Sequence, residues 1–336
     1  MSTQPFASVQ RIAVVLFGPP GRGGFNQAGL AGAERARALV QADVHAGEET
    51  QKTTRTQTLE VHWCEPAAPA ERADFLRTLL QAGAHNINQK IGLLIAHGGQ
   101  GDLPVAAVAP EFPGTQFAIT QGSTLAPHIA CYEVLQEQSA FLAGVLAAAS
   151  TRSGVVAHMS GERVRPGLAG RAAFADGVKQ QDPKVRLVTT FCGNQHDADL
   201  AYRVVCAQAD DGADVLFAMI DGGRDGAIRA CRERNIAQIG NVFDWTTREP
   251  DVFIASAIAD SGHCIELAMQ DFLTGKLSCG KKKIIGLEAA EHVRLALHPR
   301  VSDAARAAVE RFRGRLLSGA LVPAHEYVGV EFGFPP

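Results

Sequence analysis

The stretch RIAVVLFGPPGRGGFNQAGLAGAERARA (residues 11–38) decides how the rest of the chain is interpreted. An apolar run ends in a glycine- and proline-rich loop, and an amphipathic helix pattern follows. That order is typical of a buried strand whose loop holds a ligand at the N-terminus of the next helix.

The spacing of the glycines excludes the standard phosphate-binding loops. They fall at positions 18, 21, 23 and 24, which does not match GxGxxG, and the loop has no Gly-Lys-Ser/Thr ending. The loop is predicted instead to bring a cation, an aromatic face and an amide to a helix start, through Arg22, Phe25 and Asn26. Two alternatives stay open, because Asn26 could cap the helix and Phe25 could be a hydrophobic staple.

The same strand-then-helix alternation continues along the chain. Short, almost continuously apolar runs separated by helix patterns indicate parallel sheets covered on both faces, so the predicted fold class is α/β and doubly wound. The strands are expected at 11–17, 59–64, 91–96, 116–120, 128–134, 154–159, 185–191, 214–219 and 236–240. The helices are expected at 25–42, 70–84, 135–149, 166–180, 197–210 and 225–234.

The pattern restarts near Ser153, which predicts two α/β lobes. Later elements return to each lobe, so we expect residues 8–124 plus 253–278 in the N-terminal lobe. The C-terminal lobe is expected to comprise residues 125–243 plus 283–330. Ligands of open α/β sheets bind at the carboxyl ends of the strands, so a ligand cleft is expected between the lobes.

Composition excludes several classes of function. The 336 residues carry a net charge of -3 without a basic stripe, which argues against nucleic-acid binding. Seven scattered cysteines form no CxxC pair, and no histidines pair as HxxxH, so no metal site is expected. No GxSxG elbow and no nucleophile–base arrangement stands out, so we expect no enzyme, no catalytic residues and no cofactor.

Polar groups follow the later strands at the positions where a ligand would lie. Each loop is short and contains glycine, an amide or a carboxylate, and Trp245 adds a second flat face beside Phe25. Such groups suit a small planar polar ligand. Asp221 could instead be a turn residue, and Trp245 could simply be buried. The candidates after the later strands are Gly98, Gln121, Asp221, Gly222, Asn241, Asp244 and Trp245.

A succession of segments resembles the basic membrane protein family, which comprises substrate-binding proteins of ABC transporters related to purine nucleoside receptor lipoproteins. The segments are GGFNQAG, AVAPEFPGTQFAITQG, EQSAFLAGVLAAASTRSGVVAHMSG, GRAAFADGVKQQDPKVRL, ADDGADVLFAMIDGG and NIAQIGN, in the family's order. The resemblance implies a type I periplasmic-binding-protein fold, with two Rossmann-like lobes joined by three crossovers. It also implies a small-molecule ligand and, if the protein is exported, a permease partner.

The resemblance assigns a purine-stacking role to Phe25 and a nearby hydrogen bond to Asn26. The family's first-loop aspartate is absent here, Gln121 and Asn241 replace two further aspartates, and Ala259 replaces a lysine. Those charged groups are expected to hold a ribose, whereas amides suit a nucleobase edge. We therefore expect a purine base or a similar heterocycle rather than a nucleoside, with Arg22 adding a preference for an oxo-purine or an anion.

An alternative interpretation is a cytoplasmic ligand sensor or enzyme on the same scaffold. The sequence MSTQPFASVQ lacks the features of a signal peptide, and no cysteine that could serve as a lipid anchor precedes Cys64. The family resemblance predicts the periplasm or cell envelope, so the compartment stays open at this level. A dehydrogenase is not expected, because the GxGxxG fingerprint is missing.

Overall fold

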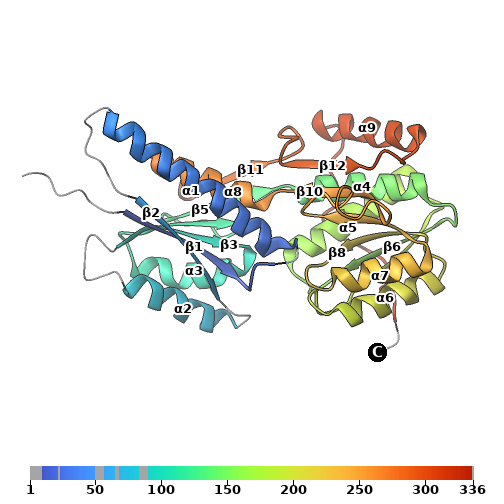
Figure 1. The fold of residues 1–336 in the computed structure, drawn as a ribbon, viewed down its shortest axis with the longest axis horizontal. Coiled ribbons are helices and arrows are strands. Elements are labelled where there is room, and N and C mark those ends of the chain that lie inside the picture. Colours follow the sequence, from blue (N-terminus) through green and yellow to red (C-terminus); the bar gives the residue numbers. More distant parts are fainter. Residues whose placement is uncertain (1–9, 22, 50–56, 65–67, 83–89, 335–336) are drawn as a thin grey trace, which may run out of the picture. The chain divides into compact units, whose positions relative to one another are not determined.

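The computed structural model describes residues 10–21, 23–49, 57–64, 68–82 and 90–334. They form two compact units, each built around one six-stranded sheet with helices on both faces (Figure 1). The α/β class and the parallel sheets predicted from the sequence are confirmed.

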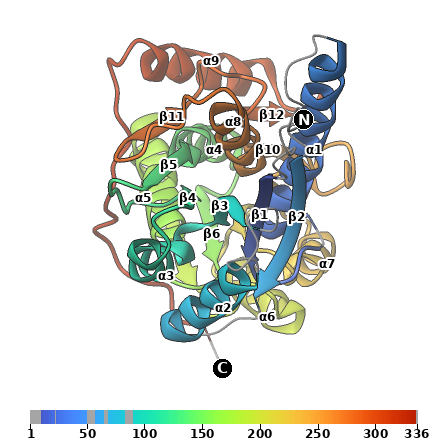
Figure 2. The ribbon, with the colours of Figure 1, turned by 90° about the vertical axis from the view of Figure 1, so that its left-hand side faces the viewer.

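The first unit contains a sheet with the strand order β11-β5-β4-β3-β1-β2. Helices α1 and α8 cover one face of this sheet and α2 and α3 cover the other (Figure 2). The apolar run of β1 forms the middle of this layer, because Ile12, Val14 and Leu16 are completely buried. The strands are β1 (Gln10–Phe17), β2 (Gln57–Cys64), β3 (Ile91–His97), β4 (Gln116–Thr120), β5 (Ile129–Val134) and β11 (Lys282–Ile285). The α-helices are α1 (Phe25–Glu49), α2 (Pro69–Gln81), α3 (Asp102–Val108) and α8 (Ser261–Leu273).

The second unit repeats this plan with the strand order β12-β10-β9-β8-β6-β7. Its neighbouring strands β7, β6, β8, β9 and β10 are parallel, and β12 pairs antiparallel with β10. The strands are β6 (Val155–Ser160), β7 (Arg186–Phe191), β8 (Val215–Met219), β9 (Ala237–Asn241), β10 (Phe253–Ala259) and β12 (Val293–Leu297). The α-helices are α4 (Gln136–Ser150), α5 (Arg165–Gln181), α6 (Ala198–Asp210), α7 (Arg224–Arg234) and α9 (Asp303–Leu317).

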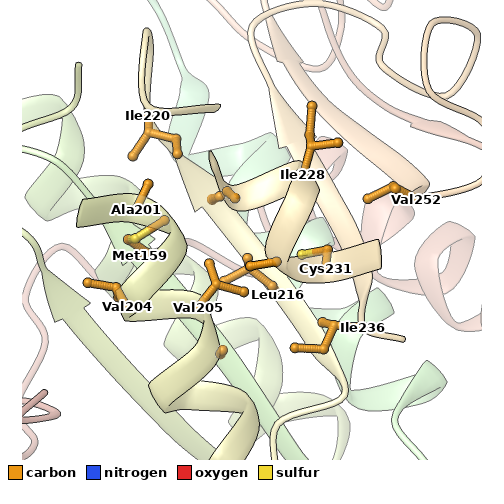
Figure 3. Close-up of a cluster of buried hydrophobic side chains, with 14 of the residues drawn as sticks. Met159, Ala201, Val204, Val205, Leu216, Ile220, Ile228, Cys231, Ile236 and Val252 are labelled. Carbon is orange, nitrogen blue, oxygen red and sulfur yellow. The ribbon is translucent and has the colours of Figure 1, made fainter. Parts of the chain in front are cut away.

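An aliphatic cluster joins α6 and α7 to the second sheet (Figure 3). Val204 and Val205 of α6 and Cys231 of α7 lie against Leu216 of β8, and all four are at most 2% exposed. Burial of this apolar surface, at about 25 cal/mol per Å², is what fixes both helices on the sheet. The start of α7 is thereby held at the carboxyl end of β8.

Glycines allow one pair of helices in each unit to touch backbone to backbone. In the first unit, a Cβ on Gly32 of α1 would lie 2.2 Å from the carbonyl oxygen of Gly262 in α8. In the second, a Cβ on Gly144 of α4 would lie 2.1 Å from the carbonyl oxygen of Phe174 in α5. Any larger side chain would force these helices apart, so both units depend on glycine at the same kind of helix contact.

The division of the chain differs from the one expected from the sequence. The chain passes between the units after Glu133 and after Asp260, later than the expected lobe boundaries at 124–125 and 243–253, whereas the third passage, after Ile284, lies next to the expected boundary at 278–283. β10 pairs with β9 and β12 in the second sheet, so residues 253–260 do not belong to the first unit. β5 pairs with β4, so residues 125–133 do. Strand pairing decides this division, because the apolar pattern of a strand does not indicate which sheet the strand joins.

Candidate ligand-binding site

Phe25 begins α1 and is held by a buried histidine from the neighbouring strand. Its ring stacks on His97 with 4.2 Å between ring centroids and 20° between planes. His97 is fully buried, and its Nε2 lies 3.1 Å from the carbonyl oxygen of Phe25. Its Nδ1 lies 2.9 Å from the hydroxyl of Thr120, the last residue of β4. The Phe25 ring is therefore fixed at the carboxyl edge of the first sheet.

Asn26 does not cap α1, because the helix already begins at Phe25. Its side-chain Nδ2 donates instead to the carbonyl oxygen of Phe17, at the end of β1, over 3.5 Å. Gly18 makes room for this contact, since a Cβ there would lie 2.8 Å from Nδ2. Asn26 thus ties the start of the helix to the end of the strand.

Gly98 and Gln121 lie at the same edge, after β3 and β4. Gly98 has φ 112°, and a Cβ there would meet Phe25 Cε1 at 3.1 Å, so only glycine fits beside the aromatic ring. Gln121 is buried with φ 55°, and its N–H donates to the Tyr132 carbonyl oxygen over 2.7 Å. The structure thus brings Phe25, Asn26, Gly98 and Gln121 together, whereas Arg22 lies outside the described residues.

In the second unit, Asp221 and Gly222 form the turn between β8 and α7. The N–H of Asp221 donates to the Gln195 carbonyl oxygen over 3.1 Å, and its own carbonyl accepts from the Arg224 N–H over 3.1 Å. A Cβ on Gly222 would lie 3.3 Å from the His196 backbone, so the loop after β8 packs closely on the loop after β7. These backbone hydrogen bonds are those of a turn residue, which is the second of the two roles that the sequence left open for Asp221.

Trp245 and Asp244 support the loop after β9. Trp245 is 8% exposed, and its indole N–H donates to the carbonyl oxygen of Asn241 over 3.1 Å. Asp244 Oδ1 accepts from the N–H and the hydroxyl of Thr246, over 3.0 and 2.6 Å. These contacts correspond to the buried alternative for Trp245 and give Asp244 a role in the turn.

Arg224 is the residue of this edge that sequence reasoning missed. It is 1% exposed, and its Nη2 donates to Asn241 Oδ1 over 2.6 Å and to the Ile220 carbonyl oxygen. Its guanidinium lies over the Trp245 ring, 4.4 Å from the centroid. The only sequence signal was its place in IDGGRDG, and an arginine at a helix start is normally solvated.

Burial lowers the pKa of Arg224 to about 10, against the opposing charges of Asp221 and Asp225, while the Arg248 cation lowers it further. The guanidinium therefore stays protonated at neutral pH. Arg248 also lies over the Trp245 ring, 5.2 Å from the centroid. The edge of the second sheet thus holds a buried cation beside the amide of Asn241.

Two matching α/β units with polar loops at the carboxyl ends of their strands form a fold that two-domain solute-binding proteins share. The chain belongs to the Bmp family of PnrA-like ABC transporter substrate-binding proteins, whose sequence profile matches residues 49–312. The family inferred from the motifs is confirmed, and its description names a binding protein rather than an enzyme. Small-molecule ligands and transporter permeases are the partners that this family implies.

Curated relatives share low identity with the chain, which spans about half of their length. The chain is 22% identical to the transcriptional activator protein med of Bacillus subtilis, over 56% of this chain and 59% of that protein. It is 22% identical to a purine-binding protein of Brucella abortus, over 47% and 45%. It is 26% identical to basic membrane protein D of Borreliella burgdorferi, over 45% and 46%.

Solved structures share the fold. A solute-binding protein of an ABC transporter system from Aeropyrum pernix superimposes with a TM-score of 0.76 at 18% identity, covering 93% of this chain and 92% of that one. A second, from Conexibacter woesei, gives a TM-score of 0.68 at 21% identity, covering 95% and 100%. None of the helices within the described ranges is long and apolar enough to cross a membrane.

Proposed function

We propose that this substrate-binding protein takes a purine base, or a similar flat heterocycle, in preference to a nucleoside. The observation that carries the proposal is the Phe25–His97 stack, which holds an aromatic ring at the carboxyl edge of the first sheet. Because the ring is already held in place, stacking on a nucleobase costs it little further side-chain entropy. The Brucella relative named a purine-binding protein supports the same ligand class.

The preference for a base rests on the groups that the chain lacks. The positions expected to hold ribose hydroxyls carry the amides Gln121 and Asn241 and the buried Ala259. Amides form weaker hydrogen bonds to a sugar hydroxyl than carboxylates or a lysine do. A ribose would therefore add little favourable binding free energy here, while removing its hydroxyls from water would still cost free energy.

Ligand capture is proposed to draw on the carboxyl edges of both units, which close by hinge bending where the chain passes between them. X-ray scattering with and without hypoxanthine tests this step. A smaller radius of gyration with the ligand is expected, and an unchanged value at saturation would contradict hinge closure.

Isothermal titration calorimetry tests the ligand class, with adenine, hypoxanthine, guanine and xanthine set against their nucleosides. Bases are expected to bind more tightly than nucleosides. Phe25→Ala is expected to weaken base binding by about 1–3 kcal/mol, the value of one base–aromatic stack. Phe25→Tyr keeps the ring and is the matched control. Tight nucleoside binding without base binding would overturn the proposal.

The proposal also covers the cellular compartment in which the protein works. We infer from the family that the receptor works in the periplasm or cell envelope and delivers its ligand to a permease. Fractionation of cells that express the full gene product with a C-terminal tag tests this inference. Recovery in the envelope or periplasmic fraction is expected, and recovery in the cytosol alone would favour the sensor, an alternative that the family match does not favour.

A further inference from the structure

Strand β2 forms one end of the first sheet (Figure 2). Within the part of the chain that the structure describes, β1 is the only strand that pairs with it. Every second residue of an edge strand directs its N–H and C=O groups away from the sheet, where they can pair with a further strand. An edge of this kind is therefore a template for the addition of another strand.

The corresponding edge strand of the second sheet is covered by the chain itself. β7 lies at the same end of its sheet, and the Phe332 N–H donates to the Thr189 carbonyl oxygen of β7 over 2.8 Å. Phe332 and Phe334 also pack against the aliphatic cluster of this unit. For residues 58–63 of β2, the described ranges contain no backbone hydrogen bond to any element except β1. The two units thus differ in how this edge is protected.

β2 also exposes apolar surface. Trp63 is 53% exposed, and Leu59 and Val61 on the same face are only partly buried. These side chains form one row, because successive residues of a strand alternate between its two faces. On the other face the Glu60 and His62 side chains are 34% and 30% exposed, with 3.2 Å between a carboxylate oxygen and Nε2. β2 therefore has an apolar row and a polar row.

The order of these residues is self-complementary. In antiparallel pairing about a twofold axis at Val61, Trp63 of each copy lies opposite Leu59 of the other, on one face. On the other face, Glu60 of each copy lies opposite His62 of the other, so an imidazole N–H can donate to a carboxylate. Pairs of both kinds stabilise antiparallel strands. A register shift of one residue would instead bring the apolar row of one copy beside the polar row of the other.

We propose that β2 is a self-association surface, through which a second copy of this chain pairs edge to edge and extends the first sheet. A second copy is the partner that this edge fits, because the same strand supplies both halves of every pair. Arg11 ion-pairs with Glu60 over 2.7 Å, so the carboxylate is already held in place before association. One strand from each copy makes a small interface, so the dimer is expected to dissociate at micromolar concentrations.

Sedimentation equilibrium over a concentration series tests the surface. His62→Glu sets two carboxylates opposite each other twice, so it should raise the dissociation constant about 2- to 30-fold. His62→Lys keeps a cation opposite Glu60 and should associate at least as tightly as the wild type. Trp63→Lys removes the apolar pair and should weaken association about tenfold or more. The matched control is Leu103→Lys, which changes a residue of α3 that is 68% exposed and should have no effect.

Cysteine cross-linking tests the register. Residues opposite each other in antiparallel strands have Cα atoms about 4.5–5.5 Å apart, which a disulfide can bridge. Val61→Cys oxidised with diamide is therefore expected to give a covalent dimer on non-reducing gels, whereas Leu103→Cys and the wild type are not.

Three results would overturn the proposal. A wild type that stays monomeric throughout the micromolar range would leave this edge to a strand of a different protein. A dimer that forms equally well in His62→Glu and Trp63→Lys would place the interface elsewhere. A dimer without the Val61→Cys cross-link would contradict the twofold register at Val61. Because His62→Lys and His62→Glu change the same position and are expected to differ, a general loss of folding does not imitate the predicted pattern.

Discussion

Gln121 and Val242 occupy matching positions in the two units. Each is the first residue after a strand, β4 or β9, at the same place in the strand order of its sheet, and each has a left-handed φ, 55° and 69°. Each N–H donates to the adjacent strand, Gln121 to the Tyr132 carbonyl over 2.7 Å and Val242 to the Ala257 carbonyl over 3.2 Å. The carboxyl edges of the two sheets are thus shaped by the same backbone turn.

Val242 carries most strain in this pair, because a β-branched residue is strongly disfavoured at positive φ. Val242→Asn is expected to stabilise the protein by about 1 kcal/mol, since asparagine tolerates this conformation. The midpoint of thermal unfolding should rise by about 2–4 °C. Val242→Ile keeps the branched side chain and should not stabilise. A lower midpoint for Val242→Asn would show that the packing of the valine outweighs the strain.

Thr120 supports the histidine that holds Phe25. Its hydroxyl bonds His97 Nδ1 over 2.9 Å and accepts from the Gly98 N–H over 3.1 Å. Thr120→Val keeps the shape but removes these partners inside the core, so a loss of about 1–3 kcal/mol in unfolding free energy is expected in urea titrations. Thr124→Val, at a partly buried position nearby, should change stability by less than about 0.5 kcal/mol. Equal effects of the two substitutions would contradict this role.

His158 makes stability depend on pH. Its ring is fully buried between the hydroxyls of Thr189 and Ser160, and burial, followed by the charge of Arg171, lowers its pKa to about 3. The unfolded chain binds a proton near pH 6.5 while the folded protein does not, so stability is complete above that pH and falls as the pH decreases towards 3.

The expected slope from His158 is about 1.4 kcal/mol per pH unit between pH 6 and 4, measured by urea unfolding at each pH. His158→Gln removes the titrating group and should make the curve shallower over this interval. His298→Gln changes a histidine in a partly exposed turn and is the control. Parallel curves for wild type and His158→Gln would contradict the assignment.

The C-terminal segment is anchored by Arg171 of α5. Arg171 is 5% exposed, ion-pairs with Glu331, and lies over the rings of Phe191 and Tyr327 at 4.7 and 4.6 Å. Glu331→Ala leaves a buried cation without this partner, so a loss of about 1–3 kcal/mol is expected, less than for a fully buried pair because Glu331 is partly exposed. Glu326→Ala, on an exposed residue of the same segment, should be neutral in chemical unfolding. A neutral Glu331→Ala would show that the aromatic contacts alone hold the segment.

Much of the fold could be predicted because its signals are local. The apolar run of β1, the loop that follows it and the helix beginning at Phe25 can all be identified within 30 or so residues of sequence. The restart of the strand–helix pattern near Ser153 extended this prediction to two lobes, in agreement with the family resemblance. The sequence also placed Phe25, Gly98 and Gln121 after strands that prove to be neighbours in one sheet.

The remaining features depend on contacts between distant residues. β10 has the same apolar character as any strand of the first sheet, yet its hydrogen bonds to β9 and β12 place it in the second. For Trp245 the sequence left open a flat ligand face or a buried residue, and the structure buries it against Phe253. In both cases the residues that determine the position lie on another strand, so the local sequence pattern could not identify them.

The sequence by itself determined the α/β class, the family and the aromatic residue at the carboxyl edge of the first sheet, because periodicity and short motifs encode them locally. Only the tertiary structure decided the division into units, the left-handed turns at Gln121 and Val242, and the buried position of Arg224. A guanidinium at a helix start is ordinarily solvated. Here the packing of β8, β9 and Trp245 encloses it at the carboxyl edge of the second sheet.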